Sequence, residues 1–316
     1  MDIQRVLLIM PFFMGYEKDL VACLQEKYQV TLLDSEELGE SIRNKFYGNK
    51  IRNQIRKIDR KLVARDIYSS EESYSSQFLK SHKIDNQKFD IVLTINGHYI
   101  PNSVYEVIKK SNPEATFVLY LWDDADNLFK TTHFKYFEKK YSYNLDDCKK
   151  YSMSYLPMFT RITYLGHDKD LYDFSIIASA YADRISIAKK LYWQYSDQFR
   201  FFIYFYQDPV KEDFYCYNEP ISYDQYISIL RHSKCLIDIP HPKQQGPTTR
   251  AFDTVQTDTK LLTTNTNIIN YPIYSSNIEI IDRNEPVLPL DFINTPYINN
   301  GKKVHTTNQW IEAIGL

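Results

Sequence analysis

The fold is decided by the sequence Gln244-Gln245-Gly246-Pro247-Thr248-Thr249-Arg250-Ala251-Phe252-Asp253-Thr254-Val255. Two apolar runs flank it, Cys235-Leu236-Ile237-Asp238-Ile239 before and Leu261-Leu262-Thr263-Thr264-Asn265 after. The first run is short and is followed by prolines, as is typical of a buried strand, and Gly246-Pro247 then interrupts the chain. Thr248 or Thr249 can cap a helix that begins at this point. The pattern predicts a strand, a loop, a helix and a second strand.

The start of this helix has the properties of an anion site. It would direct unpaired backbone N–H groups and the positive end of the helix dipole at the edge of the sheet. Arg250 lies in the first turn, and its spacing to Asp253 places both on one helix face. A guanidinium binds a diphosphate well, and a carboxylate accepts hydrogen bonds from a ribose or sugar. The alternative is a solvated ion pair worth under about 1 kcal/mol.

Residues 235–265 resemble the donor-site segment of bacterial capsular and exopolysaccharide glycosyltransferases with the GT-B fold. The family pattern is approximately Gln-x-Gly-Leu-Thr-x-Arg-x-x-Glu and ends in a Thr-Thr-Asn strand. The matching positions are Gln244, Gly246, Thr248, Arg250 and Thr263-Thr264-Asn265. Pro247 replaces the usual Leu, and Asp253 replaces Glu. The resemblance implies a nucleoside diphosphate sugar held by Gly246, Thr248, Thr249, Arg250 and Asp253, without an obligatory metal or cofactor.

Length and composition agree with two domains. The chain has 316 residues, of which 43% are hydrophobic, so it can form two cores of ordinary size. Its net charge of −2 argues against nucleic acid as a partner. The four cysteines have neither zinc spacing nor an obvious pairing, which predicts free thiols in a reducing compartment. No apolar run is long enough to span a membrane, so we expect a cytoplasmic protein.

Strands and helices alternate along the whole chain, which predicts an α/β protein with two Rossmann-like, doubly wound domains. We expect an acceptor-side domain over residues 1–160 and a donor domain over residues 161–300. In the GT-B resemblance the two domains face a cleft. The same resemblance implies that residues 301–316, with a helix around Trp310, pack back on the first domain.

Asp124 and His98 are the candidate catalytic bases. Asp124 belongs to an acidic group that follows the predicted strand 116–122, in the half of the chain that lacks the anion site. A carboxylate there could deprotonate an acceptor hydroxyl, whereas the alternative is a surface turn that caps the next helix. His98 follows another strand and a glycine turn, although a single histidine is more often structural. An inverting reaction would need one of them.

Ser179 and Arg184 are candidates for a second part of the donor site. They follow the predicted strand 171–178, and in the resembling family this loop approaches the donor phosphates. Arg250 and a helix dipole alone would support only about millimolar binding, so Arg184 would supply a second cation. The alternative is that Arg184 pairs with Asp183.

Residues 41–68 predict a basic amphipathic helix. Ile51, Ile55, Ile58 and Leu62 follow helical spacing, and Lys and Arg occupy the other faces. Such a helix binds anionic membrane or a lipid-diphosphate acceptor, which would place the protein at the inner face of the cell membrane. The alternative is a solvated helix packed on its own domain.

These observations together favour a metal-independent hexosyltransferase that acts in the synthesis of capsule, exopolysaccharide or lipopolysaccharide. The acceptor would be a saccharide or a lipid-linked saccharide. Two other classes stay open: a non-catalytic protein that binds nucleotide sugars or polyanions, and a peripheral membrane protein that acts through its basic helix.

Overall fold

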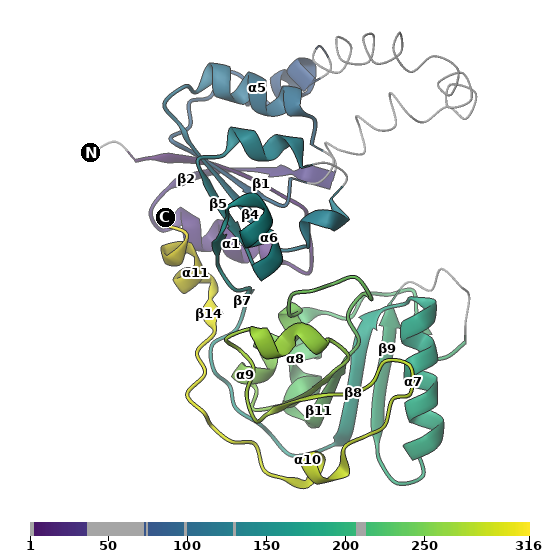
Figure 1. Cartoon of the computed structure of the whole chain (residues 1–316). Coiled ribbons are helices and arrows are strands. Elements are labelled where there is room, and N and C mark those ends of the chain that lie inside the picture. The colour runs from purple at the N-terminus through teal and green to yellow at the C-terminus, as the bar shows by residue number, and fades with distance from the viewer. Residues whose placement is uncertain (1–2, 37–72, 74, 98–99, 129–130, 207–212) are drawn as a thin grey trace, which may run out of the picture. The chain divides into compact units, whose positions relative to one another are not determined.

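The computed structural model describes residues 3–36, 73, 75–97, 100–128, 131–206 and 213–316. The predicted basic helix at 41–68 and the candidate base His98 lie outside the described residues. The chain divides into two compact units, residues Met1–Leu156 with Ile311–Leu316, and residues Pro157–Trp310 (Figure 1). None of the helices in the described ranges is long and apolar enough to cross a lipid bilayer.

The first unit contains a six-stranded sheet in the order β2-β1-β3-β4-β5-β6, in which all neighbours are parallel. Its strands are β1 (Arg5–Met10), β2 (Gln29–Asp34), β3 (Ile91–Ile95), β4 (Thr116–Leu121), β5 (Lys139–Ser142) and β6 (Ser154–Tyr155). Its helices include α1 (Tyr16–Gln25), α5 (Asn102–Ser111), η1 (Ala125–Asn127), η2 (Thr132–Tyr136) and α6 (Leu145–Tyr151). The strand order reverses between β1 and β3, as it does in doubly wound folds.

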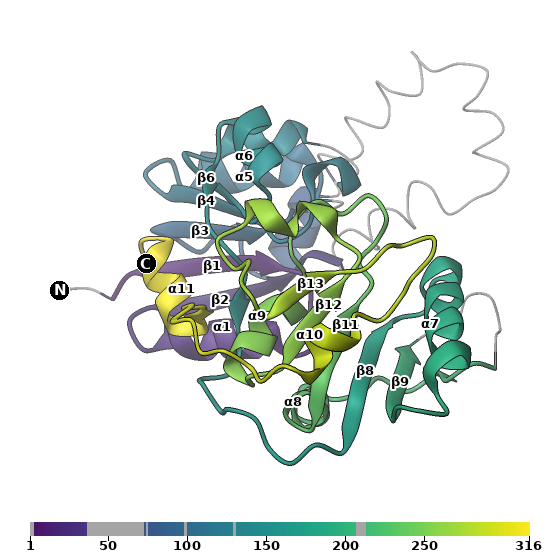
Figure 2. The ribbon, with the colours of Figure 1, turned by 60° about the horizontal axis from the view of Figure 1, so that its bottom comes forward.

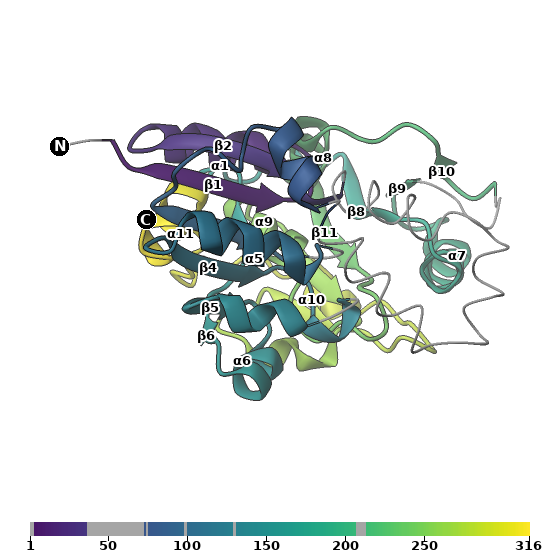
Figure 3. The same ribbon diagram turned by 90° about the horizontal axis from the view of Figure 1, so that it is seen from above.

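The first sheet is covered on both faces, which explains its sequence. Every residue of β3 and all of β1 except Arg5 are buried, as expected for parallel strands with helices on each side. Helix α5 lies along the sheet (Figure 3) and contributes Val104, Tyr105 and Ile108 to the core beside Phe117 of β4. The apolar spacing on α5 therefore decides which helix face meets the sheet.

The second unit repeats this architecture in the order β10-β9-β8-β11-β12-β13, again all parallel (Figure 2). Its strands are β8 (Tyr172–Ser179), β9 (Phe201–Tyr206), β10 (Cys216–Tyr217), β11 (Ser233–Asp238), β12 (Lys260–Thr263) and β13 (Ile278–Ile280). Its helices include α7 (Ala182–Tyr195), α8 (Tyr223–Arg231), α9 (Thr249–Gln256), η3 (Thr266–Asn270) and α10 (Leu290–Asn294). The prediction of two Rossmann-like domains is confirmed.

The C-terminal residues Ile311–Leu316 belong to the first unit, whereas the chain up to Trp310 belongs to the second. Strand β14 (His305–Thr306) pairs with β7 (Phe159–Thr160), and α11 (Thr307–Ala313) follows it. In the middle of this helix the Trp310 ring packs on the Phe159 ring at 4.8 Å between centroids. Its last residues belong to the first unit, where the Tyr141 hydroxyl donates to the Ile314 carbonyl at 3.4 Å.

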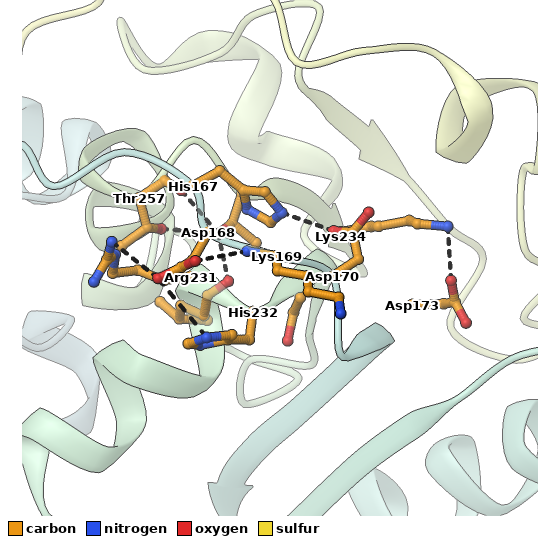
Figure 4. A network of polar contacts seen from close by, with 12 residues as sticks. His167, Asp168, Lys169, Asp170, Asp173, Arg231, His232, Lys234 and Thr257 are labelled. Atoms are coloured by element: carbon orange, nitrogen blue, oxygen red, sulfur yellow. Dashed lines mark hydrogen bonds and ion pairs between the residues drawn. The ribbon is translucent and has the colours of Figure 1, made fainter.

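A charged network ties together the amino ends of strands in the second sheet (Figure 4). The Asp173 carboxylate accepts a hydrogen bond from the Arg200 backbone N–H at 2.9 Å and lies 2.8 Å from Lys234 Nζ. Asp168 is 3.4 Å from the Arg231 guanidinium. Burial of Asp173 opposes ionisation, but its hydrogen bonds with Arg200 and Lys234 hold the pKa of the carboxyl below its ordinary value. The network therefore stabilises the second unit by joining the amino ends of its strands.

Asp173→Asn should lower the free energy of unfolding at pH 7 by about 1 to 3 kcal/mol, because it removes the buried charge with which Lys234 and Arg200 pair. Since the folded pKa is depressed, the stabilisation is present above the unfolded pKa and is lost as pH falls through the folded pKa. Urea unfolding at a series of pH values should show the gap closing below about pH 4. Asp146→Asn, at an exposed pair 3.9 Å from Lys149, is the control. If both variants lose the same free energy of unfolding, Asp173 contributes no more to stability than an exposed ion pair does.

Candidate functional site

The candidate site lies where β8 and β11 end. In the second sheet β8 leads through β9 and β10 to one side, and β11 leads through β12 and β13 to the other. The reversal between β8 and β11 is the topological switch point, where doubly wound domains bind ligands. Ser179 is the last residue of β8, and Asp238 is the last residue of β11. The sequence predicted a strand close to each of these two residues. It named Ser179 as a site residue but did not name Asp238.

Helix α9 begins as predicted, with Thr248 at the N-cap. The Thr248 hydroxyl makes no capping hydrogen bond to the helix and instead donates to Asp238 Oδ2 at 2.9 Å. The expectation that a threonine side chain caps this helix is therefore wrong, because Asp238 competes for the hydroxyl. The N–H of Ala251 donates to the Thr248 carbonyl at 3.1 Å, and no side chain caps the N–H groups of Thr249 and Arg250, which suits them to bind an anion.

Arg250 is oriented by the same carboxylate. Its Nε donates to Asp238 Oδ1 at 2.7 Å, and the side chains of Arg250 and Asp238 are 21% and 3% exposed. Burial opposes the charge of Arg250, but the Asp238 carboxylate raises its pKa above the ordinary value. Within the described ranges no residue binds the terminal nitrogens of the Arg250 guanidinium. These nitrogens are the donors that a ligand could use.

Arg184 supplies a second buried cation beside Arg250. Its Nε donates to the Ile239 carbonyl at 2.6 Å and its Nη1 to the Ser179 carbonyl at 3.2 Å. The Tyr181 ring lies 4.8 Å from its guanidinium carbon. Burial and the nearby charge of Arg250 lower the pKa of Arg184 to about 10, so it stays charged at neutral pH. Two like charges at one sheet edge make a site that favours an anion.

The loop before α9 is held by a residue that the sequence flagged only as part of a motif. Asn265 Nδ2 donates to the carbonyls of Gln245 at 3.1 Å and Gly246 at 3.2 Å. The buried Gly246 is therefore fixed against the end of β12. The Thr-Thr-Asn run thus contributes an anchor for the loop, which sequence spacing alone could not reveal.

Arg283 was missed by the sequence analysis and completes the same edge. One terminal nitrogen donates to Thr264 Oγ1 at 2.9 Å, and the other pairs with the Asp183 carboxylate. The alternative partner predicted for Arg184 was Asp183, and the structure shows that Asp183 pairs with Arg283 instead. No local pattern around residue 283 signals this role, since the contact joins residues far apart in the chain.

Asp253 lies inside the second unit. It is 1% exposed, and its Oδ1 accepts hydrogen bonds from the Thr160 hydroxyl at 2.6 Å and the Tyr223 hydroxyl at 2.7 Å. The Tyr226 hydroxyl donates to Oδ2 at 3.1 Å. These bonds fasten α9 to β7 and α8. The predicted contact of Asp253 with a ribose or sugar stays a prediction.

Asp124 is also buried, in the first unit. Its Oδ1 accepts hydrogen bonds from the Tyr143 hydroxyl at 2.7 Å and Asn144 Nδ2 at 2.8 Å. It stands at the N-cap of η1 without a capping hydrogen bond from its side chain, so the alternative of a helix-capping carboxylate is wrong. Its role as a general base stays a prediction.

A glycine at position 97 is required by the fold beside the undescribed His98. Gly97 has a φ of +68°, and a Cβ there would lie 2.7 Å from the Tyr105 hydroxyl and 2.9 Å from His133 Nε2. His133 is buried and pairs with the Asn96 carbonyl at 3.1 Å.

Among the described residues no group of three or more His, Cys, Asp or Glu side chains could hold a metal ion.

Comparison with known proteins shows the fold. Neither a protein-family model nor a curated protein matches the chain. The apo structure of OtsA has a TM-score of 0.55 at 10% identity and covers 99% of both chains. The N-terminal domain of Candida albicans trehalose-6-phosphate phosphatase has a TM-score of 0.53 at 10% identity, over 98% of this chain and 96% of that one. MurG of Acinetobacter baumannii has a TM-score of 0.51 at 10% identity, over 92% and 89%.

The two parallel sheets and these likenesses define a two-domain Rossmann-like fold of the GT-B type, as the sequence predicted. At 10% identity the likeness carries the fold alone. What the site binds therefore has to be argued from its own residues.

Asp253→Asn should change the pH dependence of stability. Burial raises the pKa of Asp253 to about 6, although its three hydroxyl partners lower it. The folded state then binds the proton more tightly than the unfolded state. The free energy of unfolding of the wild type should therefore fall by about 3 kcal/mol as the pH rises from about 4 to about 6. The variant should lack this decline in urea unfolding. Asp197→Asn, at an exposed position, is the control and should unfold as the wild type does. If wild type and Asp253→Asn differ in stability by the same amount at every pH, the pKa of Asp253 is not raised in the folded state.

Proposed function

We propose that this chain is a glycosyltransferase that moves a sugar from a nucleoside diphosphate sugar to a saccharide or lipid-linked saccharide. The observation that carries the proposal is the pair of guanidinium groups, the buried Arg184 and the half-buried Arg250, at the switch point beside the start of α9. Two cations and free backbone donors suit a diphosphate better than a single phosphate or a carboxylate. The resemblance of residues 235–265 to donor-site segments supports the same ligand.

The geometry supports catalysis through the leaving group. As the bond between the sugar carbon and the diphosphate oxygen breaks, its electron pair stays on the diphosphate and negative charge grows there. Arg250 is already oriented by Asp238, so it needs no rearrangement to stabilise that charge. Arg184 and the α9 dipole act on the same group. The acceptor hydroxyl attacks the sugar carbon and loses its proton to a base.

The base and the setting are finer parts of the proposal. We assign the base to Asp124 or His98 if the reaction inverts the anomeric centre, and to neither if it retains it. On the GT-B resemblance the acceptor is held by the first domain. The same resemblance supports a metal-independent hexosyltransferase of surface polysaccharide synthesis in the cytoplasm. The basic segment 41–68 would bring it to the inner face of the membrane.

A second candidate is a non-catalytic protein that binds nucleotide sugars. The observation that favours it is the environment of Asp124, whose Oδ1 already accepts hydrogen bonds from Tyr143 and Asn144. This oxygen would have to give up one of its two donors before it could receive the proton of an acceptor hydroxyl. In this candidate Arg250 binds the diphosphate but no sugar is transferred.

Binding of UDP, GDP or dTDP should raise the melting temperature of the wild type by several degrees at saturating concentrations, since a ligand at 100 times its Kd adds about 2.7 kcal/mol. Arg250→Ala should abolish the shift because it removes the oriented cation. The matched control is Arg231→Ala, which lies in the charged network at the other edge of the sheet. A shift that persists in Arg250→Ala, or that vanishes equally in the control, would remove the proposed site.

Asp124→Asn should lower turnover of donor by about 10² to 10⁴ in an inverting enzyme while nucleotide binding is kept. Tyr143→Phe is the matched control, because it deletes a hydrogen bond to Asp124 and leaves the carboxylate in place. Donor turnover is followed by release of nucleotide with and without saccharide acceptors. Equal losses in both variants would give Asp124 a structural role. A wild type that binds donor and releases no nucleotide would favour the binding protein.

A further inference from the structure

A cavity lies within the second unit, at the C-terminal end of α9 rather than at the end that carries Arg250. Its volume is about 540 Å³, which is in the range of small-molecule sites in proteins. The walls come from residues 163–164, from residues 255–258 at the end of α9, and from residues 297–309 around β14. Figure 1 locates α9 and β14 in this unit. No residue of the cavity belongs to the site at the switch point.

The lining is rich in side chains that both donate and accept hydrogen bonds. Four carboxamides contribute to it: Gln256, Asn299, Asn300 and Gln309. Hydroxyl groups come from Thr163, Thr306 and two tyrosines, whereas Val255 and Val304 are the aliphatic residues of the wall. A ligand that fills this space must carry many groups able to act as donor and acceptor at once.

Tyr164 and Asp258 form a pair that points to the class of that ligand. The Tyr164 ring is 59% exposed, and its hydroxyl donates to Asp258 Oδ2 at 2.5 Å. A flat exposed ring offers an apolar face to the C–H groups of a pyranose. The carboxylate beside it accepts hydrogen bonds from sugar hydroxyls, which are stronger when the acceptor is charged.

The charges of the cavity favour a neutral ligand over an anion. The Asp258 carboxylate would repel a phosphate, whereas Lys302, whose Nζ donates to the Pro272 carbonyl at 2.6 Å, is exposed to solvent, where its charge is screened. Desolvation lowers the pKa of His305, which keeps its ring neutral at pH 7. Lys303 is the remaining cation of the lining, and it is exposed to solvent, where its charge is screened.

We propose that this cavity is a saccharide-binding site separate from the switch-point site, and that it takes a short neutral glycan. Tyr164 stacks on one sugar ring, Asp258 accepts its hydroxyl hydrogens, and the carboxamides around residues 299–309 contact the remaining hydroxyl groups. The proposal does not rest on the proposed glycosyl transfer, since a binding protein would use the cavity in the same way.

The test is saturation-transfer NMR of the full chain with maltotriose, triacetylchitotriose and galactobiose. At least one of them should bind, and Tyr164→Ala should weaken binding at least about tenfold, which corresponds to about 1.4 kcal/mol. Asp258→Asn should weaken it as well. Asp258 has a φ of +49°, which asparagine tolerates, so this variant keeps the fold. Tyr274→Ala, at a tyrosine that is 38% exposed and outside the cavity, is the matched control and should bind as the wild type does.

Arg250→Ala separates the two sites. Saccharide binding that survives in Arg250→Ala and is lost in Tyr164→Ala supports the cavity. Binding lost in Arg250→Ala and kept in both cavity variants would place the glycan at the switch point and overturn the proposal. Absence of binding by all three saccharides would also overturn it, as would pyrophosphate binding that Lys303→Ala abolishes. Melting temperatures of all variants at the wild-type value verify that each is folded.

Discussion

The site depends on one buried carboxylate, that of Asp238. It is the last residue of β11, and its two oxygens accept hydrogen bonds from Thr248 and from Arg250. A buried charge is strongly unfavourable unless it is paired and hydrogen-bonded, so these two contacts are obligatory for the fold. Because Thr248 and Arg250 both belong to the start of α9, the carboxylate fixes where this helix begins relative to the sheet. The strand end thereby sets the direction of the helix dipole and of the guanidinium.

Pairing with Asp238 occupies only one side of Arg250. The terminal nitrogens remain for a ligand, and the adjacent Arg184 is held by two backbone carbonyls, which are neutral acceptors. Among the described residues Arg184 therefore has no carboxylate at ion-pair distance, although Asp238 and Asp183 act on it at longer range. In the function that we propose, a bound anion would compensate this cation, and in that respect a preorganised site differs from a structural ion pair. Asp173 differs from Asp238 in this respect. Arg200 and Lys234 both bind the Asp173 carboxylate, so these cations are engaged within the protein.

Helix α9 is also fastened through Asp253. Asp253 receives hydroxyl groups from Thr160, Tyr223 and Tyr226, which belong to β7 and α8. A helix of eight residues has little stability of its own, so these tertiary contacts decide its position. The replacement of Glu by Asp at this place fits an inward role, because the shorter side chain meets the three hydroxyl groups inside the unit. The proposed anion site and the proposed saccharide site thus lie at opposite ends of this helix.

The sequence by itself determined the architecture. Buried parallel strands are continuous apolar runs in the sequence, and the Gly246-Pro247 break marked the loop, so local pattern predicted the two doubly wound domains and the place of Thr248 and Arg250 at a helix start. Ser179 and Arg184 were selected through the family resemblance, and the binding role of all four residues stays a prediction. Only the tertiary structure decided which partner each of them has. In the sequence Asp238 is a single polar residue within an apolar strand, and nothing near it indicates that it binds Arg250. Arg283 and Asn265 are separated by about twenty residues or more from the groups that they bind. Hydrogen bonds between distant segments depend on strand order and register, and neither leaves a periodic trace in the sequence.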